Sequence, residues 1–262
     1  MNAYLLTDTD AHGVATVTIN RPELHNAFDD LLIATLTSEL RRLDGDPQVR
    51  VVLLAARGKS FSAGADLNWM RRMADYSREE NLADSMSLAG LMTTLQRLSK
   101  PTIALVQGAA YGGGVGLVAC CDIALAAETA TFCLSEVKLG LIPAVISPYV
   151  VEAIGSRAAR RYFLTAERFD AAEAQRLGLI HELVAADALR GRGESLAALL
   201  IQNGPAALTA TKNLVAAVCG SPIGDDLIAE TAERIADIRS SDEGKDGVSA
   251  FLQKRPPAWV KG

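Results

Sequence analysis

The stretch Gly112-Gly113-Gly114-Val115-Gly116 is the most informative part of this chain, because it joins a predicted strand to a predicted helix. An apolar run over residues 102–106 leads into it, and residues 117–121 lead out. Three consecutive glycines cost backbone entropy on folding, so a positive φ or a ligand lying close to the main chain must require them. A helix start also presents free N–H groups, which attract negative charge. We therefore expect the chemistry of this protein to take place against this turn.

A second turn of the same design, Ser62-Ala63-Gly64-Ala65-Asp66, precedes a predicted helix that starts at Leu67. If both turns follow strands of one layered core, backbone N–H groups from both can converge on one point. Two converging N–H donors form an oxyanion hole, which stabilises charge that develops on a carbonyl oxygen. Taken singly, either turn is also typical of an ordinary tight corner.

Glu136 lies in a mostly apolar stretch that runs to Pro143. Burial there would raise the pKa of its carboxyl group, which suits a general acid or base near neutral pH. A salt bridge to Lys138 or a surface position is the structural alternative.

Composition and charge restrict the class of protein. The 262 residues are 49% hydrophobic and 22% charged, which allows one large core with or without a smaller appendage. The net charge of −5 argues against nucleic acid as the main partner. No run of about 18 apolar residues occurs, so we expect no membrane span, and residues 1–4 lack the features of a signal peptide. The cysteines, which we expect to be buried and reduced, indicate a cytoplasmic location.

Cysteine and histidine form no metal-binding pattern. The four cysteines match no zinc spacing, and the adjacent pair Cys120-Cys121 predicts buried, reduced thiols. The three histidines show no H-x₃-H arrangement. We expect no metal site.

Strands and helices alternate in the first part of the chain, which predicts an α/β core. Residues 14–19 alternate as a strand, with Leu5-Leu6 as its hairpin partner, and Asn26 is placed to cap a helix that begins near Ala27. Further buried strands are predicted over residues 49–55, 102–106 and 122–126, and a long helix over residues 78–98.

From Pro148 onward the pattern is mainly helical. Short helices are predicted over residues 150–154, 158–164 and 171–177, and a last strand over residues 181–184. Helical stretches then cover residues 188–202, 206–217, 223–238 and 246–254. We expect these last helices to pack on one another without a sheet. The predicted division is a core over residues 1–200 and a C-terminal helical oligomerisation lobe over residues 201–262.

Five motifs resemble, in order and spacing, those of the enoyl-CoA hydratase/isomerase (crotonase) family over nearly the whole chain. They are Asn20-Arg21-Pro22 with Asn26-Ala27, residues 61–67, the glycine turn, Cys121-Asp122, and Ser135-Glu136 with residues 139–143. The resemblance implies a spiral of β-β-α repeats with a C-terminal helical trimerisation lobe, assembled as a homotrimer or a homohexamer. It also implies an acyl-CoA thioester as the substrate. Because coenzyme A is part of that substrate, no separate cofactor is expected.

The resemblance assigns roles to individual positions. Ala65 and Gly113 supply the two N–H groups that polarise the thioester carbonyl, and Glu136 is the acid/base. The positions that bind substrate or coenzyme A by resemblance are Arg21, His25, Ala27, Ala63, Asp66, Leu67, Gly112, Gly116, Ala144, Phe251 and Lys254. The last two reach the coenzyme A of a neighbouring subunit.

One position departs from the family pattern. Typical hydratases of the family carry two glutamates around one water; Glu136 matches the second, but the first falls on Gly116. Three accounts follow. Glu136 alone adds water across the 2,3 double bond, which a syn addition allows because both events occur on one face. Alternatively, Glu136 is the single base of an enoyl-CoA isomerase and moves a proton from C2 to C4. In the third account another carboxylate, such as one on the substrate, supplies the missing acid.

The amino-acid sequence of residues 132–148 resembles that of the bacterial methylglutaconyl-CoA hydratases of leucine degradation and of their relatives that act on terpenoid acids. Those enzymes act on acyl-CoAs with an extra carboxylate. We therefore expect hydration of 3-methylglutaconyl-CoA or a related branched substrate.

Two other classes of function are weighed against this one. Gly114-x-Gly116-x-x-Ala119, followed by Glu136, fits the fingerprint of an NAD-dependent oxidoreductase. A helix that must end by Asp122 and a strand that would end near Glu128 argue against it. An inert scaffold would keep the assembly and the coenzyme A site only, and would not need a carboxylate at Glu136.

Overall fold

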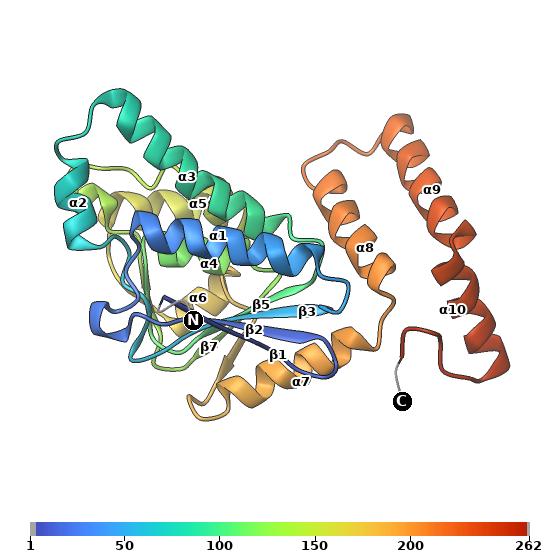
Figure 1. Ribbon diagram of the computed structural model, residues 1–262. Helices are drawn as coiled ribbons and strands as arrows, with labels where there is room; N and C mark the ends of the chain where they lie inside the picture. Colours follow the sequence, from blue (N-terminus) through green and yellow to red (C-terminus); the bar gives the residue numbers. More distant parts are fainter. Residues whose placement is uncertain (1–3, 261–262) are drawn as a thin grey trace.

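The computed structural model, which describes residues 4–260, contains a six-stranded sheet in the order β1-β2-β3-β5-β7-β10 (Figure 1). The pair β1–β2 is an antiparallel hairpin, and every other neighbouring pair is parallel. The strands are β1 (Leu5–Thr9), β2 (Val14–Ile19), β3 (Val51–Ala56), β5 (Thr102–Val106), β7 (Ile123–Ala127) and β10 (Glu182–Val184).

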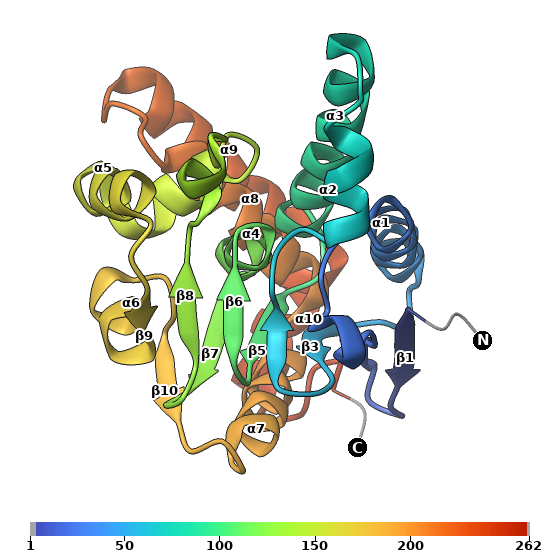
Figure 2. The same cartoon turned by 90° about the vertical axis from the view of Figure 1, so that its left-hand side faces the viewer.

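A second sheet of four very short strands lies beside the first, in the order β4-β6-β8-β9 (Figure 2). The strands are β4 (Ser60–Ser62), β6 (Ala109–Tyr111), β8 (Thr131–Cys133) and β9 (Phe169–Asp170). β4, β6 and β8 are parallel, so the carboxyl ends of all three meet at one edge. That edge positions the candidate site.

The chain builds the two sheets by repeating one unit. In each repeat a strand of the large sheet is followed by a strand of the small sheet and then by helix, as in β5-β6-α4 (Gly113–Cys120). The other repeats are β3-β4 with α2 (Leu67–Met73) and α3 (Arg78–Gln96), and β7-β8 with the 3₁₀ turn η2 (Glu136–Leu139) and α5 (Ser147–Thr165). This topology confirms the predicted α/β class.

Helices cover both faces of the large sheet, because alternate residues of its strands point to opposite sides. Val52 and Leu54 of β3 belong to the main core with α1 (Asp30–Gly45) and α3. Val51 and Leu53 pack instead in a second cluster with α7 (Leu189–Ile201). The remaining short elements of this part are η1 (Pro22–Leu24) and α6 (Ala171–Leu177).

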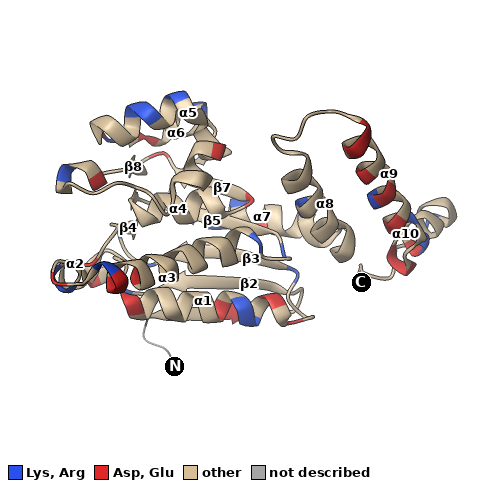
Figure 3. Cartoon of the chain, turned by 90° about the horizontal axis from the view of Figure 1, so that it is seen from above, with Lys and Arg blue, Asp and Glu red and all other residues tan. Residues whose placement is uncertain are grey.

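Three helices stand apart from the sheets at the end of the described chain: α8 (Pro205–Val218), α9 (Asp225–Ser240) and α10 (Asp242–Gln253) (Figure 1). Lys212 of α8 joins them to the core through an ion pair with Asp122, 2.7 Å long. The Arg50 guanidinium donates to the carbonyl oxygens of Asn203 and Trp259. Figure 3 shows acidic residues along α9 and α10.

Most predicted elements are confirmed with shifts of one to four residues at their ends. Two predicted helices, over residues 150–154 and 158–164, are parts of α5, which is broken at Gly155 with φ +76°. The expectation that the helix over residues 188–202 packs without a sheet is wrong, because Leu189 and Ala197 pack on β3, β5 and β7. The predicted cap at Asn26 is also wrong: Asp29 caps α1, which begins at Asp30.

The Asn26 side chain does not cap α1, because it forms hydrogen bonds to three other backbone groups. It donates to the carbonyl oxygens of Arg57 and Ser60, each at 2.7 Å, and accepts from the Arg21 N–H. Its φ of 55° lies in the left-handed region, which asparagine tolerates better than most residues. Asn26 therefore holds the segment before α1 against the start of β4.

Residues 4–260 hold neither a membrane-spanning helix nor a cluster of metal-binding side chains. Between residues 4 and 260, no helix is long and apolar enough to span a bilayer. In the same range, no three His, Cys, Asp or Glu side chains are grouped so that they could hold a metal ion. Cys120 and Cys121 are buried free thiols, as predicted.

Candidate active site

The first glycine turn follows β4 and is held in place from both sides. The Phe28 N–H donates to the Gly64 carbonyl oxygen at 2.6 Å, and the Asp66 N–H donates to that of Phe28 at 2.7 Å. Position 64 requires glycine, because its φ is +92° and a Cβ there would lie 3.3 Å from the Tyr111 carbonyl oxygen. Ala65, between these bonds, has an exposed position.

The second glycine turn follows β6 and touches the first. Gly112 has φ +50°, donates its N–H to the Cys133 carbonyl oxygen, and would place a Cβ 3.9 Å from the Gly64 Cα. Helix α4 starts at Gly113, whose N–H belongs to the unpaired first turn. Within residues 4–260, neither the Ala65 N–H nor the Gly113 N–H donates to a protein acceptor. The two turns thus bring two free donors to one edge of the small sheet, with α4 at the same edge (Figure 2).

Glu136 reaches the same edge from the third strand, because it follows β8 by three residues and opens η2. Its Oε1 would lie only 3.2 Å from a Cβ on Gly112, so the carboxylate lies directly against the second glycine turn. Its Oε2 is buried and has no hydrogen-bond partner among the described residues. Burial raises the pKa of this carboxyl group above its usual value. A carboxyl with one unpartnered oxygen, beside two free N–H donors, can move protons next to a polarised carbonyl.

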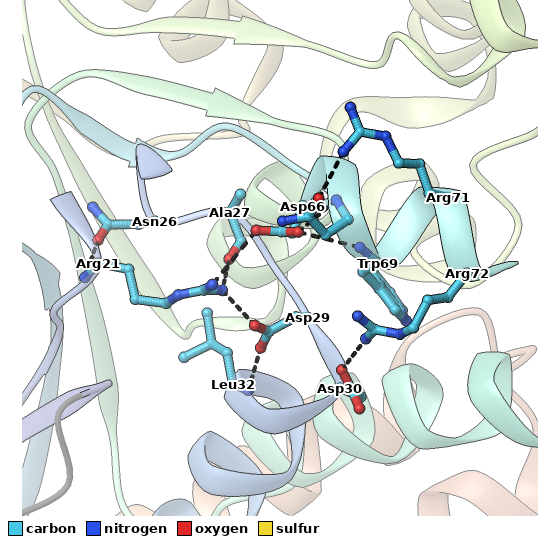
Figure 4. Close-up of polar contacts among 11 residues, drawn as sticks. Arg21, Asn26, Ala27, Asp29, Asp30, Leu32, Asp66, Trp69, Arg71 and Arg72 are labelled. Carbon is cyan, nitrogen blue, oxygen red and sulfur yellow. Dashed lines mark hydrogen bonds and ion pairs between the residues drawn. The ribbon is translucent and has the colours of Figure 1, made fainter. Parts of the chain in front are cut away.

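A buried ion network fixes the start of α2 beneath the first turn (Figure 4). The Arg21 guanidinium lies 2.9 Å from Asp29 and 3.4 Å from Asp66, and it donates to the Ala27 carbonyl oxygen. The other oxygen of Asp66 accepts from the N–H groups of Asn68 and Trp69, which caps α2. Arg21 and Asp66, which directly follows Ala65 in the chain, are thus held by each other and by the backbone.

Known proteins match this chain along its length. A model of the enoyl-CoA hydratase/isomerase family matches residues 9–262. This chain belongs to that family. A crystal structure of an enoyl-CoA hydratase from Shewanella pealeana superposes with a TM-score of 0.95 at 49% identity, and the match covers 98% of this chain and 96% of that one. The fold is therefore the crotonase fold.

Two curated crotonases carry more specific names. The 2,3-dehydroadipyl-CoA hydratase of Escherichia coli is 32% identical over 251 residues, which cover 93% of this chain and 94% of that protein. The short-chain-enoyl-CoA hydratase of Clostridium acetobutylicum is 31% identical over 246 residues, which cover 92% of each.

Position 116, to which the resemblance assigns a first glutamate, is closed in this chain. A Cβ on Gly116 would overlap the Cγ2 of Ile146 and lie 3.1 Å from the Cε of Met92. Ile146, at the start of α5, and Met92, on α3, therefore occupy the space that a side chain at position 116 would need. Sequence reasoning identified Gly116 but missed both neighbours, since nothing in the local pattern links three segments that meet only in the folded chain.

The other positions assigned by resemblance are spread around this edge. Ala63 and Leu67 are exposed and flank Ala65, and His25 pairs with the Ser60 hydroxyl at 3.1 Å. Ala144 is exposed in the loop before α5, where its N–H donates to the Ile142 carbonyl oxygen.

Phe251 and Lys254 lie on and just after α10, apart from this edge within one chain (Figure 1). Phe251 is 82% exposed, and Lys254 closes the helix in the left-handed conformation. The structure of one chain therefore does not bring them to Glu136.

The dinucleotide-binding hypothesis is wrong. Helix α4 ends at Cys120, and β7 ends at Ala127, nine residues before Glu136. Glu136 therefore opens a 3₁₀ turn after β8, whereas the fingerprint needs an acidic residue close to the end of the next strand of a βαβ unit.

Proposed function

We propose that this crotonase is an enoyl-CoA hydratase, which adds water across the 2,3 double bond of an acyl-CoA thioester. The N–H groups of Ala65 and Gly113 bind the thioester oxygen, and Glu136 is the acid/base. The observation that carries the proposal is the buried, unpartnered Oε2 of Glu136, in a carboxylate that lies against the glycine turn.

The reaction balances with one carboxyl group. The Glu136 carboxylate takes a proton from water as the water oxygen bonds to C3. The electron pair of the double bond moves through C2 toward the thioester oxygen, where two N–H donors stabilise the negative charge. The carboxylic acid then returns its proton to C2, and the thioester carbonyl re-forms. Both additions use one face, so a second protein carboxylate at position 116 is not required.

The second candidate is an enoyl-CoA isomerase, and one observation favours it. Ile146 and Met92 close position 116, which leaves Glu136 as the acid/base at the meeting point of the two glycine turns. One carboxylate can take a proton from C2 and return it to C4, so isomerisation also balances with this site.

A substrate panel separates the two candidates. We expect crotonyl-CoA and 3-methylglutaconyl-CoA to lose their conjugated thioester absorbance as water adds. A 3-enoyl-CoA would instead gain that absorbance under an isomerase. If only the 3-enoyl substrate reacts, the hydratase proposal is overturned.

We further propose a branched acyl chain with a second carboxylate, such as 3-methylglutaconyl, as the substrate class. The name of the Escherichia coli relative, a 2,3-dehydroadipyl-CoA hydratase, supports such a chain. The coenzyme A arm would then pass Ala63, Leu67 and the exposed loop at Ala144. We also propose that the enzyme is cytoplasmic. The roles of Phe251 and Lys254 require a homotrimer or a homohexamer.

A further inference from the structure

A hydroxyl pair lies next to the closed position 116 and has no role in the proposed reaction. The Thr93 Oγ1 and the Tyr149 hydroxyl are 3.0 Å apart, and both side chains are half-buried. Thr93 directly follows Met92 on α3, and Tyr149 lies three residues after Ile146 on α5. Met92 and Ile146 are the two residues that border Gly116. The pair therefore joins α3 to α5 alongside the apolar contact behind the second glycine turn.

The pair lies on the Gly116 side of the second glycine turn, next to Met92 and Ile146. Gly112 contacts Glu136, and α4 rises about 4.5 Å between Gly113 and Gly116. Tyr149 lies about one helical turn beyond Ile146 on the same face of α5. An acyl chain whose thioester oxygen is bound at Gly113 has its far end on this side of the site if it extends along α4.

One of the two hydroxyl hydrogens of the pair is not used in the bond between them. Each hydroxyl carries one hydrogen, and only one of the two can lie in the bond between them. Neither oxygen has another partner within residues 4–260. Thr37, Thr209 and Thr211 each donate to a backbone oxygen one turn back, but Thr93 does not. A half-buried donor without an acceptor is unfavourable unless water or a ligand oxygen accepts from it.

We infer that the Thr93–Tyr149 pair binds an acceptor oxygen carried by the acyl chain, and so selects a dicarboxylic acyl-CoA over a plain one. This inference rests on the proposed function. The pair can hold a carboxylate oxygen through the spare hydrogen, while the mutual bond fixes the positions of both hydroxyls.

Nearby charges do not by themselves explain such selection. Arg97 follows Thr93 by four residues and Glu152 follows Tyr149 by three, so one positive and one negative group flank the pair. Both side chains are exposed. Their opposite charges offset each other, which leaves the directional hydroxyl bond as the selective contact.

The test compares two substrates that differ in one carboxylate, crotonyl-CoA and glutaconyl-CoA. The measured quantity is the ratio of kcat/KM for glutaconyl-CoA to that for crotonyl-CoA. A hydrogen bond to a charged group supports a discrimination of about ten-fold or more. We expect Tyr149→Phe to lower the ratio by about that factor. Thr93→Val removes the other hydroxyl with little change of volume, and we expect it to lower the same ratio.

Thr94→Val is the matched control, since Thr94 is equally half-buried on α3 but has no hydrogen bond through its hydroxyl among the described residues. We expect it to leave the ratio unchanged. If both Tyr149→Phe and Thr93→Val keep the ratio within two-fold of the wild type, the inference is overturned. A wild type that hydrates crotonyl-CoA but not glutaconyl-CoA also overturns it, while the proposed function stands. A wild type that hydrates neither of these two substrates, nor 3-methylglutaconyl-CoA, overturns the proposed function itself.

Discussion

Glu136 is set apart by its surroundings rather than by its own chemistry. Its Oε2 is buried without a partner, and its Oε1 lies against Gly112. The sequence could predict the apolar neighbourhood of this residue, and with it the direction of the pKa change. It could not predict the contact with Gly112, because that contact depends on β6 and β8 lying side by side.

The raised pKa of Glu136 has a consequence for catalysis. Hydration needs the carboxylate form, so kcat/KM rises with pH through a pKa above the ordinary value of about 4.3. The pH profile of kcat/KM measures this pKa for the free enzyme. An acidic limb at or below the ordinary value would contradict the burial of this group.

The same shift predicts a change in stability. Because the folded pKa exceeds the unfolded one, the contribution of Glu136 to stability is full below the unfolded pKa and is lost as the pH rises through the folded pKa. Glu136→Gln has no charge to bury at any pH. Its Tm should therefore exceed that of the wild type at neutral pH, where Glu136 is ionised, and should show no gain near pH 4. Glu39→Gln is the control of opposite sign, since the bond to Arg42 lowers the pKa of Glu39. A Tm of Glu136→Gln that stays below the wild type at neutral pH would count against the shift.

The contact at position 116 gives a second prediction at this scale. Gly116→Ala forces its new methyl group into Ile146, and we expect a loss of about 1–3 kcal/mol in the free energy of unfolding. Adding Ile146→Ala opens that space, so the double variant should lose less than the two single variants together. Denaturant unfolding of all four proteins measures the coupling. Strictly additive losses would show that Gly116 does not pack against Ile146.

At the scale of elements, the long helices and buried strands could be predicted, and the small sheet could not. Residues 102–106 and 78–98 show clear periodicity over their length. Strands β4, β6 and β8 have three residues each and β9 has two, so no alternating pattern can develop. The cap predicted at Asn26 is wrong for a related reason: the sequence shows an acceptable cap, but not the carbonyl oxygens of Arg57 and Ser60 that bind Asn26 in the fold.

Helix α2 offers a test of how the first glycine turn is held. Asp66→Ala removes the cap, which typically costs about 0.5–2 kcal/mol, and leaves Arg21 with Asp29 as its remaining buried carboxylate partner. We expect a larger loss of stability than for Asp170→Ala, which removes the cap of α6 without touching a buried arginine. Equal losses in thermal unfolding would argue against a role for the Arg21 network.

At the scale of the whole molecule, the three C-terminal helices expose an unusual amount of apolar surface. α8 carries a single charged residue, Lys212, whereas acidic residues mark α9 and α10 (Figure 3). The large apolar residues exposed on and between these helices are Val215, Val218, Ile223, Ile228, Ile235, Val248, Phe251 and Leu252. Apolar surface of this extent typically marks an interface, which fits the proposed trimer or hexamer.

Self-association can be tested on α9. Ile228 and Ile235 are seven residues apart, so they lie on one stripe of the helix. We expect Ile228→Asp with Ile235→Asp to lower the molecular mass measured by light scattering from that of an oligomer to that of a monomer. Leu164→Asp, at an exposed residue of α5, is the control and should leave the mass unchanged. A wild type that is monomeric at micromolar concentration would contradict the proposed assembly.

The role of Glu136 as the acid/base of a hydratase can be tested by comparing Glu136→Gln with the wild type. Glu136→Gln keeps the size and polarity of the side chain but removes the titrating group. With the best substrate of the panel, the account predicts a fall in the rate of hydration of about 10²–10⁴-fold. The dissociation constant for the CoA thioester product should stay close to that of the wild type. Hydration by Glu136→Gln within ten-fold of the wild-type rate would contradict the account.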